Sequence, residues 1–429
     1  MKWRGRLAAV GLVLGLLCPR AEAAALAQAG KSAVLMDVTT GTVLFENNSH
    51  EALAPASVTK VMTMLLVMEA VDSGKIALTD TVTASEAAAA KGGSQIYLKV
   101  GETMSVSDML KSVAVSSAND CACALAVTGT ASVAAAAKGG SQIYLKAGET
   151  MSVSDMLKSV AVSSANDCAC ALAEHICGSE AAFVEAMNQR AKELGMRDTH
   201  FVNCTGLDDD DSAKLHKTSA YDIALMSREL LKNHPTIKEY TTIWMDTVRN
   251  GAFGLSNTNK LIRFYPGATG LKTGYTSGAG YCLSASAQRE GMELIAVVMG
   301  AQSSQTRNAA CKELLDYGFA NFAVINPELT EVPGVAVKLG HQASVPVQLG
   351  ESAGLLIEKA QKSTVTTEIT LEESVTAPVS LGQRIGTLAI KSGEQTLRQI
   401  PLVAAESVER LTFGELFVKV LKQTAMAKM

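Results

Sequence analysis

Residues 57–68 have the sequence Ser57-Val58-Thr59-Lys60-Val61-Met62-Thr63-Met64-Leu65-Leu66-Val67-Met68. The segment follows Pro55 and is apolar almost all round, which predicts a buried central helix. Residues at i and i+3 share one helix face, so Lys60 can bring its amine to the Ser57 hydroxyl without another segment. A serine hydroxyl attacks well only when a base takes its proton. Lysine can be that base if burial lowers its pKa from about 10.4 towards neutrality.

A second motif, Lys272-Thr273-Gly274, stands just before the strand-like run 280–288. Glycine in a strand lets a substrate backbone approach closely. A lysine beside it can bind a carboxylate or lower the pKa of a neighbouring lysine. The similar tripeptide Lys391-Ser392-Gly393 lies in a predicted hairpin turn, and its apolar flanks favour a structural role.

A third motif, Ser-Ala-Asn, occurs as Ser117-Ala118-Asn119 and again as Ser164-Ala165-Asn166. A hydroxyl and an amide on a loop can relay protons and orient a peptide, although such a tripeptide is more often a helix N-cap. The two copies belong to a tandem duplication, in which 83–126 recurs as 130–173 with an offset of 47 residues and two differences in 44 positions. Long-established structural repeats are rarely so alike, so we interpret one copy as surplus to the fold.

Helix continuity favours the second copy of this motif. After Asn166 a helix can continue through 167–176 to Gly178, whereas the chain after Asn119 meets β-branched residues and a glycine at 127–130. We therefore expect Ser164 and Asn166 in the site and the extra chain in a turn region before residue 130, where loops tolerate insertion. Ser117 and Asn119 remain the alternative, and competition between the copies would leave the protein poorly folded and inactive.

In this order the three motifs S-x-x-K, S-x-N and K-T-G resemble those of penicillin-recognising serine enzymes. The surrounding sequence is similar to the D-alanyl-D-alanine carboxypeptidases, the low-molecular-mass penicillin-binding proteins. The resemblance rests on 55–63, 92–95, 257–261 and 269–274, and on 377–379 and 401–404, which are similar to that family's C-terminal β domain. It extends from about Ala33 to the final helix.

This resemblance implies a mechanism and a set of ligands. Ser57 would attack the D-Ala–D-Ala carbonyl and become the acyl-enzyme, Lys60 would take its proton, and the Ser and Asn of S-x-N would assist. The substrate-binding group would be Lys272, Thr273, Gly274 and Tyr275, with the first two on the terminal carboxylate and the N–H groups of Ser57 and Tyr275 as the oxyanion hole. The implied partners are the peptidoglycan pentapeptide and β-lactam antibiotics, with no metal or cofactor.

The fold class expected is α/β (α+β), a penicillin-binding or β-lactamase-like transpeptidase domain with an antiparallel sheet and a helical cluster, followed by a small all-β domain. Patterning predicts a hairpin over 31–47, a helix over 181–194, another capped by Ser219 with Asp222 completing a capping box, strands at 280–288 and 293–300, and a helix over 307–323. We expect an export signal at 1–25, the catalytic domain at 26–323, the β domain at 324–405 and an amphipathic helix at 406–429.

Charge and targeting features restrict the function further. Lys+Arg 38 against Asp+Glu 42 argues against a nucleic-acid partner. The basic start, the apolar run 7–17 and the small residues 21–23 are typical of an export signal, which places the protein at the extracytoplasmic face of the membrane or in the cell wall. The final helix carries an apolar face that predicts contact with a membrane surface, with docking on its own domain as the alternative: Leu411, Leu416, Phe417, Val420 and Leu421.

The sequence also predicts the state of the cysteines and leaves two rival functions open. The nine cysteines show no zinc-site spacing and are expected to be buried thiols rather than disulfides. One rival function is a class A-like β-lactamase, but no convincing E-x-x-x-N loop appears between S-x-N and K-T-G, and that family has no β domain. The other is a catalytically impaired penicillin- or peptidoglycan-binding protein.

Overall fold

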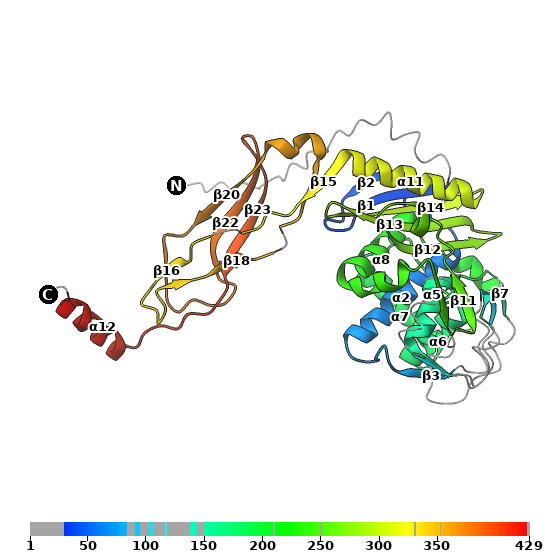
Figure 1. Ribbon diagram of the computed structural model, residues 1–429, viewed down its shortest axis with the longest axis horizontal. Helices are drawn as coiled ribbons and strands as arrows, with labels where there is room; N and C mark the ends of the chain where they lie inside the picture. Colours follow the sequence, from blue (N-terminus) through cyan, green and yellow to red (C-terminus); the bar gives the residue numbers. More distant parts are fainter. Residues whose placement is uncertain are drawn as a thin grey trace, which may run out of the picture.

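The structure, a computed structural model, describes residues 30–83, 91–94, 103–105, 116–117, 138–143, 150–208, 211–248, 251–329, 332–351 and 353–426. The expected export signal lies outside these residues. Figure 1 shows a mixed body of helices and sheet up to the strand β15 (Phe322–Ile325), followed by an elongated β body and a terminal helix. This is the predicted fold class.

The mixed body is organised around a five-stranded antiparallel sheet in the order β12-β13-β14-β1-β2. Its strands are β1 (Ser32–Asp37), β2 (Val43–Asn47), β12 (Ala268–Thr276), β13 (Gly280–Arg289) and β14 (Met292–Ala301). The predicted N-terminal hairpin therefore completes a sheet whose other strands come over 200 residues later, with Val34 opposite Val297. Alternate residues of β1 enter two cores: Val34 and Met36 pack with the helical cluster, and Ala33 and Leu35 pack on the other face.

Helices cover both faces of this sheet. The helix α11 (Ser304–Asn321) covers one face, and the other carries the helical cluster, as Figure 1 shows. The cluster consists of α2 (Lys60–Asp72), α5 (Val153–Ala161), α6 (Asn166–Cys177), α7 (Glu180–Glu193), α8 (Ala220–Asn233) and α9 (Lys238–Thr241), with the 3₁₀ turns η1 (Ala56–Thr59), η4 (Asp211–Leu215) and η5 (Pro235–Ile237). The short helix α10 (Leu261–Phe264) shares the core of α11 through Leu261. The predicted central helix is α2, which is buried on nearly every side.

The start of α8 departs from the predicted capping box. Ser219 does accept a hydrogen bond from the Asp222 N–H. The Asp222 carboxylate, however, accepts from the Asp198 N–H and the Thr199 hydroxyl instead of reaching back to residue 219. A long-range contact has replaced the local one, and it joins α8 to the loop that follows α7.

Short strands pair the two duplicated segments with β3 and with each other. They are β3 (Thr81–Thr83), β4 (Lys91–Ser94), β5 (Thr103–Ser105), β6 (Ser116–Ser117), β7 (Lys138–Gln142), β8 (Thr150–Ser152) and β9 (Val162–Ser164), with the hairpin β10 (Met245–Val248) and β11 (Phe253–Ser256) nearby. Thr81 in β3 pairs with Ser105 of the first copy and with Ser152 of the second, which are equivalent residues. β6 and β9 also pair in parallel at equivalent positions. Both copies of the duplicated segment therefore pair with the same strand, β3.

The C-terminal body is all-β, as predicted. It contains a three-stranded sheet, β17-β16-β21, and a four-stranded one, β18-β23-β22-β20, while β19 pairs with β15. The strands are β16 (Val335–Lys338), β17 (Ser344–Val345), β18 (Val347–Leu349), β19 (Leu355–Glu358), β20 (Val365–Leu371), β21 (Ser374–Thr376), β22 (Arg384–Ser392) and β23 (Gln395–Ala404), with η6 (Lys359–Thr364) between β19 and β20. Gly393 turns the β22–β23 hairpin at φ +57°, so the Lys391-Ser392-Gly393 tripeptide lies at a turn tip.

The terminal helix is α12 (Phe413–Met426), which Figure 1 places beyond the β body. Phe413, Phe417 and Leu421 are exposed on it. Within the residues that the structure describes, no helix is both long and apolar enough to cross a membrane.

Candidate active site

The nucleophile candidate, Ser57, lies in η1 immediately before α2. Its neighbour Ala56 has φ +48°, a left-handed conformation that residues with a side chain rarely adopt. The Thr59 hydroxyl donates to the Ala56 carbonyl at 2.9 Å. Gly206 covers the same carbonyl so closely that a Cβ on residue 206 would lie 1.8 Å from the oxygen. The turn that presents Ser57 is therefore fixed from both sides.

Thr59 is fixed in turn by a buried histidine. The Val202 N–H donates to His216 Nδ1 at 3.1 Å, so the ring proton is on Nε2, which donates to the Thr59 hydroxyl at 2.8 Å. Burial lowers the pKa of His216 to about 3. The ring is thus neutral at physiological pH and completes a chain of hydrogen bonds that ends on the Ala56 carbonyl.

Lys60 is fully buried at the start of α2, and its Nζ is surrounded by oxygen atoms. It lies 2.8 Å from Ser57 Oγ, 3.2 Å from Ser164 Oγ and 3.1 Å from the Thr205 carbonyl, and it also contacts Asn166 Oδ1. Burial holds the Lys60 pKa well below its ordinary value, while negative charge on Cys204 or Cys170 would act in the opposite sense. A neutral amine here can accept the Ser57 proton.

The second Ser-Ala-Asn copy supplies the residues beside Lys60. Ser164 ends β9 at φ +58°, and the N-cap of α6 is Ala165, which makes no side-chain cap. The hydroxyl of Ser164 therefore points to Lys60 rather than capping the helix. α6 continues from Asn166 to Cys177 and ends at Gly178, as predicted. Of the first copy, Ser117 lies in β6, and Asn119 is outside the described residues.

The Lys-Thr-Gly motif lies on β12, which runs against η1. A Cβ on Gly274 would lie 2.8 Å from the Pro55 carbonyl oxygen and 3.0 Å from the Ser57 nitrogen. The absence of a side chain at Gly274 therefore lets the strand approach the serine turn, which brings the two motifs together.

Lys272, two residues before Gly274 on β12, is a second buried lysine. Its Nζ donates to the Thr273 carbonyl at 2.7 Å. Burial lowers its pKa well below the ordinary value, and the positive charges of Lys60 and Arg307 lower it further. An anionic ligand would relieve this repulsion, which suits a site for a carboxylate.

Two other residues of this edge have defined partners. The Thr273 hydroxyl lies 2.6 Å from that of Thr258, whose backbone N–H donates to the Val162 carbonyl of β9. The Thr258 loop therefore connects the strand bearing Lys272 to the strand bearing Ser164. Tyr275 is 56% exposed and stacks on Tyr281 with ring centroids 4.3 Å apart.

Several residues that shape the site were not predicted from the sequence. The Thr205 carbonyl and Gly206 belong to a turn organised by Asn203, whose side chain accepts from the N–H groups of residues 205 and 206. His216 reaches Thr59 across 157 positions. The Asn203-to-Gly206 segment could have been predicted as a turn, but nothing local indicated which helix it would contact.

The cysteine prediction was wrong at one position. Cys168 is in a disulfide. The two-residue spacing rules out a bridge between Cys168 and Cys170, but it does not prevent pairing with a cysteine elsewhere in the chain. Cys170, Cys177, Cys204, Cys282 and Cys311 are thiols. Burial raises the pKa of Cys282 to about 11 and that of Cys311 to about 12, which makes these two unreactive.

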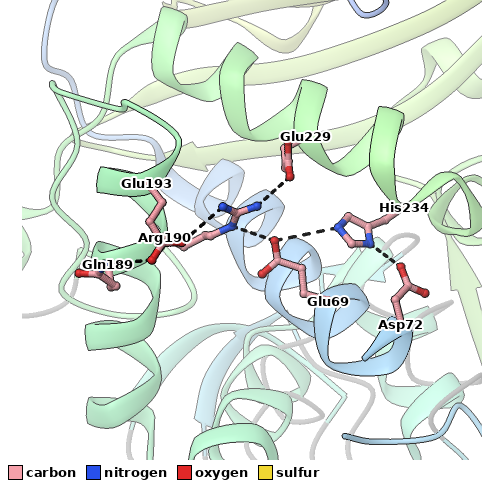
Figure 2. A network of polar contacts seen from close by, with 7 residues as sticks. All are labelled: Glu69, Asp72, Gln189, Arg190, Glu193, Glu229 and His234. Atoms are coloured by element: carbon pink, nitrogen blue, oxygen red, sulfur yellow. Dashed lines mark hydrogen bonds and ion pairs between the residues drawn. The ribbon is translucent and has the colours of Figure 1, made fainter. Parts of the chain in front are cut away.

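Elsewhere among the helices, two glutamates and a histidine lie close enough together to hold a metal ion: Glu69, Glu229 and His234. Figure 2 shows the Arg190 guanidinium between the two glutamates, with contacts of 2.8 and 2.7 Å. His234 Nδ1 lies 2.5 Å from Asp72. Since Arg190 already forms ion pairs with both carboxylates, we interpret the cluster as an ion-pair network that joins α2, α7 and α8.

Comparison with known proteins agrees with this geometry. The D-alanyl-D-alanine carboxypeptidase family matches residues 20–135 and 127–303, and the penicillin-binding protein 5 C-terminal domain matches residues 330–410. The chain belongs to the D-alanyl-D-alanine carboxypeptidase family. The family is matched as two overlapping stretches, which meet where the duplicated segments meet.

Individual relatives of this carboxypeptidase-family chain cover between 68% and 94% of it. It is 39% identical over 417 residues to D-alanyl-D-alanine carboxypeptidase DacF of Bacillus subtilis, with 94% of each chain covered. It resembles the crystal structure of penicillin-binding protein 5 from Haemophilus influenzae at a TM-score of 0.64 and 28% identity, covering 89% of this chain and 98% of that one. Penicillin-binding protein D2 of Listeria monocytogenes, solved with ampicillin bound, aligns at a TM-score of 0.52 and 28% identity, over 68% of this chain and 98% of that one.

Proposed function

We propose that this chain is a serine-type D-alanyl-D-alanine carboxypeptidase that removes the terminal D-alanine from peptidoglycan stem peptides through an acyl-enzyme on Ser57. The observation that carries the proposal is the 2.8 Å contact between Ser57 Oγ and a fully buried Lys60 Nζ, beside the strand of Lys272. The family and the activity named for its relatives support the same reaction.

Acylation begins when neutral Lys60 takes the Ser57 proton. Ser57 Oγ then attacks the carbonyl carbon between the two D-alanines, and the N–H groups of Ser57 and Tyr275 stabilise the oxyanion. The leaving amine receives a proton from Lys60 through the Ser164 hydroxyl, which lies 3.2 Å from Lys60 Nζ. Water next attacks the ester and gives a proton to Lys60, which passes it to Ser57 Oγ as the ester bond breaks and the shortened peptide leaves.

Substrate binding uses the buried cation on β12. Lys272 and the Thr273 hydroxyl would hold the terminal carboxylate. Asn166 contacts Lys60 through Oδ1, and its NH₂ group would donate to the peptide backbone. β-Lactam antibiotics should acylate Ser57 through the same contacts, and the ampicillin-bound relative supports such binding.

The location follows from the substrate, because peptidoglycan lies outside the cytoplasmic membrane. We assign 1–25 as an export signal, 26–323 as the catalytic domain, 324–405 as the β domain and 406–429 as the terminal segment. The exposed Phe413, Phe417 and Leu421 of α12 give this segment an apolar surface suited to lying on a membrane.

D-Alanine release from diacetyl-L-Lys-D-Ala-D-Ala tests the proposal. We expect release by the intact protein, none by Ser57→Ala, and unchanged release by Ser73→Ala, a serine at the far end of α2. Folded protein that releases no D-alanine would favour the impaired binding protein. Rapid multiple turnover of nitrocefin would instead favour the β-lactamase.

A further inference from the structure

Two thiols meet directly behind the candidate base. Cys170 lies on α6 and Cys204 in the turn before Gly206, and their Sγ atoms are 3.2 Å apart although 34 positions separate them in the chain. Both side chains are fully buried. They belong to the two segments that supply acceptors to Lys60 Nζ, Asn166 from α6 and the Thr205 carbonyl from the turn.

Zinc is the alternative occupant of this pair, since Glu180 Oε1 lies 3.4 Å from Cys204 Sγ. A tetrahedral zinc ion with Zn–S bonds of about 2.3 Å would hold two sulfurs roughly 3.7 Å apart. The observed separation of 3.2 Å is shorter than that and exceeds a covalent S–S bond of about 2.05 Å by roughly 1 Å. Among the residues that the structure describes, this group offers two sulfurs and one carboxylate, whereas a structural zinc site uses four ligands.

We propose that Cys170 and Cys204 are joined by a disulfide in the exported protein. The bond forms by exchange with an external disulfide during folding, before the pair is buried. One cysteine thiolate attacks the external disulfide and releases one thiol, and the second thiolate then attacks the mixed disulfide and releases the other. Two electrons and the two cysteine protons leave with the two released thiols.

This bond would fix the environment of Lys60. It would connect α6 to the turn of residues 203–206, so that Asn166 and the Thr205 carbonyl keep their positions around Nζ. A disulfide carries no charge, so it would also remove the thiolates that would raise the Lys60 pKa. The effect on catalysis rests on the proposed function, whereas the existence of the bond does not.

Peptide mapping tests the bond itself. Full-length protein exported into an oxidising compartment is denatured in alkylating agent without reductant and digested with trypsin. We expect the Cys204 peptide, residues 198–214, to be linked to residues 159–190 through Cys170, with fragmentation distinguishing Cys170 from Cys168 and Cys177. Alkylated Cys204, one zinc per chain by elemental analysis, or fragmentation that assigns the Cys204 bond to Cys123 in residues 112–138 would each overturn the proposal. A link from Cys168 to that peptide is a different bond and does not bear on it.

Thermal unfolding provides a second readout that does not depend on activity. Without reductant, Cys204→Ser should unfold roughly 5–10 °C below the parent protein, and in reductant the two should nearly coincide. Both proteins contain the disulfide of Cys168, so its effect on the unfolding temperature cancels when they are compared under the same condition. Cys311→Ala, a buried thiol on α11, should respond to reductant like the parent. If Cys204→Ser unfolds below the parent by the same number of degrees with and without reductant, Cys170 and Cys204 are in contact but not covalently bonded, and the proposal is overturned.

Discussion

The carbonyl oxygen of Ala56 and the α-carbon of Gly206 are in contact so close that no side chain fits between them. A Cβ on residue 206 would lie 1.8 Å from that oxygen, and Gly206 also has φ +82°. The contact is between two backbones, so rotation of a side chain cannot relieve it. The serine turn and the Thr205 turn are therefore built against each other.

The variant Gly206→Ala should accordingly lose stability by roughly 2–5 kcal/mol and acylate slowly, because Ala56 or the Thr205 carbonyl must move. Denaturant unfolding and the rate of labelling by a fluorescent penicillin measure the two effects. Gly254→Ala is the matched control, since a Cβ on β11 meets nothing within 4 Å. Equal stability of the two variants would contradict the contact.

Lys60→Arg should reduce the acylation rate by roughly a thousandfold or more, because arginine keeps the positive charge but cannot give up its proton at any working pH. In the parent protein the rate should rise with pH as Lys60 loses its proton. Burial lowers the Lys60 pKa, so this rise should occur well below pH 10.5. The measurement is the pH profile of penicillin acylation. Lys217→Arg serves as the control and should leave the profile unchanged.

His216→Gln should make the protein less sensitive to acid. The unfolded chain binds a proton on this histidine near pH 6.5, and the folded protein only near pH 3. The contribution of the neutral ring is therefore complete above pH 6.5 and is lost as the pH falls towards 3, a change of roughly 4–5 kcal/mol. Glutamine can accept from Val202 and donate to Thr59 without this change.

Free energies of unfolding at pH 7 and pH 4.5 provide the measurement for this pair of proteins. The difference between the two pH values should be smaller in His216→Gln than in the parent by roughly 2–3 kcal/mol. His50→Gln, at an exposed histidine, is the control. If the parent and the variant lose the same free energy of unfolding between pH 7 and pH 4.5, the His216 ring is not held neutral in the folded protein.

The duplicated serines make an internal comparison possible. Ser164→Ala should reduce D-alanine release by roughly a hundredfold, because its hydroxyl contacts Lys60 Nζ, whereas Ser117→Ala should leave release within about twofold. Removing residues 83–129 joins Val82 to Thr130, restores the Thr-Val-Thr sequence of β3 and keeps Ser164. This shortened protein should remain active. Activity that depends on Ser117 would instead assign the site to the first copy.

Local geometry made part of the site predictable. The proximity of Ser57 and Lys60 follows from helical spacing alone, and the choice of Ser164 followed from the length of helix after Asn166. The apolar composition of α2 likewise predicted a buried amine.

The remaining contacts depend on segments far apart in the chain. The Thr205 carbonyl reaches Lys60 across 145 positions, and no local pattern specifies that partner. The Asp222 carboxylate left its expected local cap for the loop at 198–199, and Cys168 bonded outside its own helix. In the last two cases a tertiary contact prevailed over a local expectation.

The central claim is that Ser57 becomes the acyl-enzyme. Mass spectrometry of folded protein treated with benzylpenicillin, followed by tryptic mapping, tests it most directly. The penicilloyl group should appear once per chain, on Ser57 in the peptide of residues 32–60. An adduct on any other residue, or none on folded protein, would contradict the account.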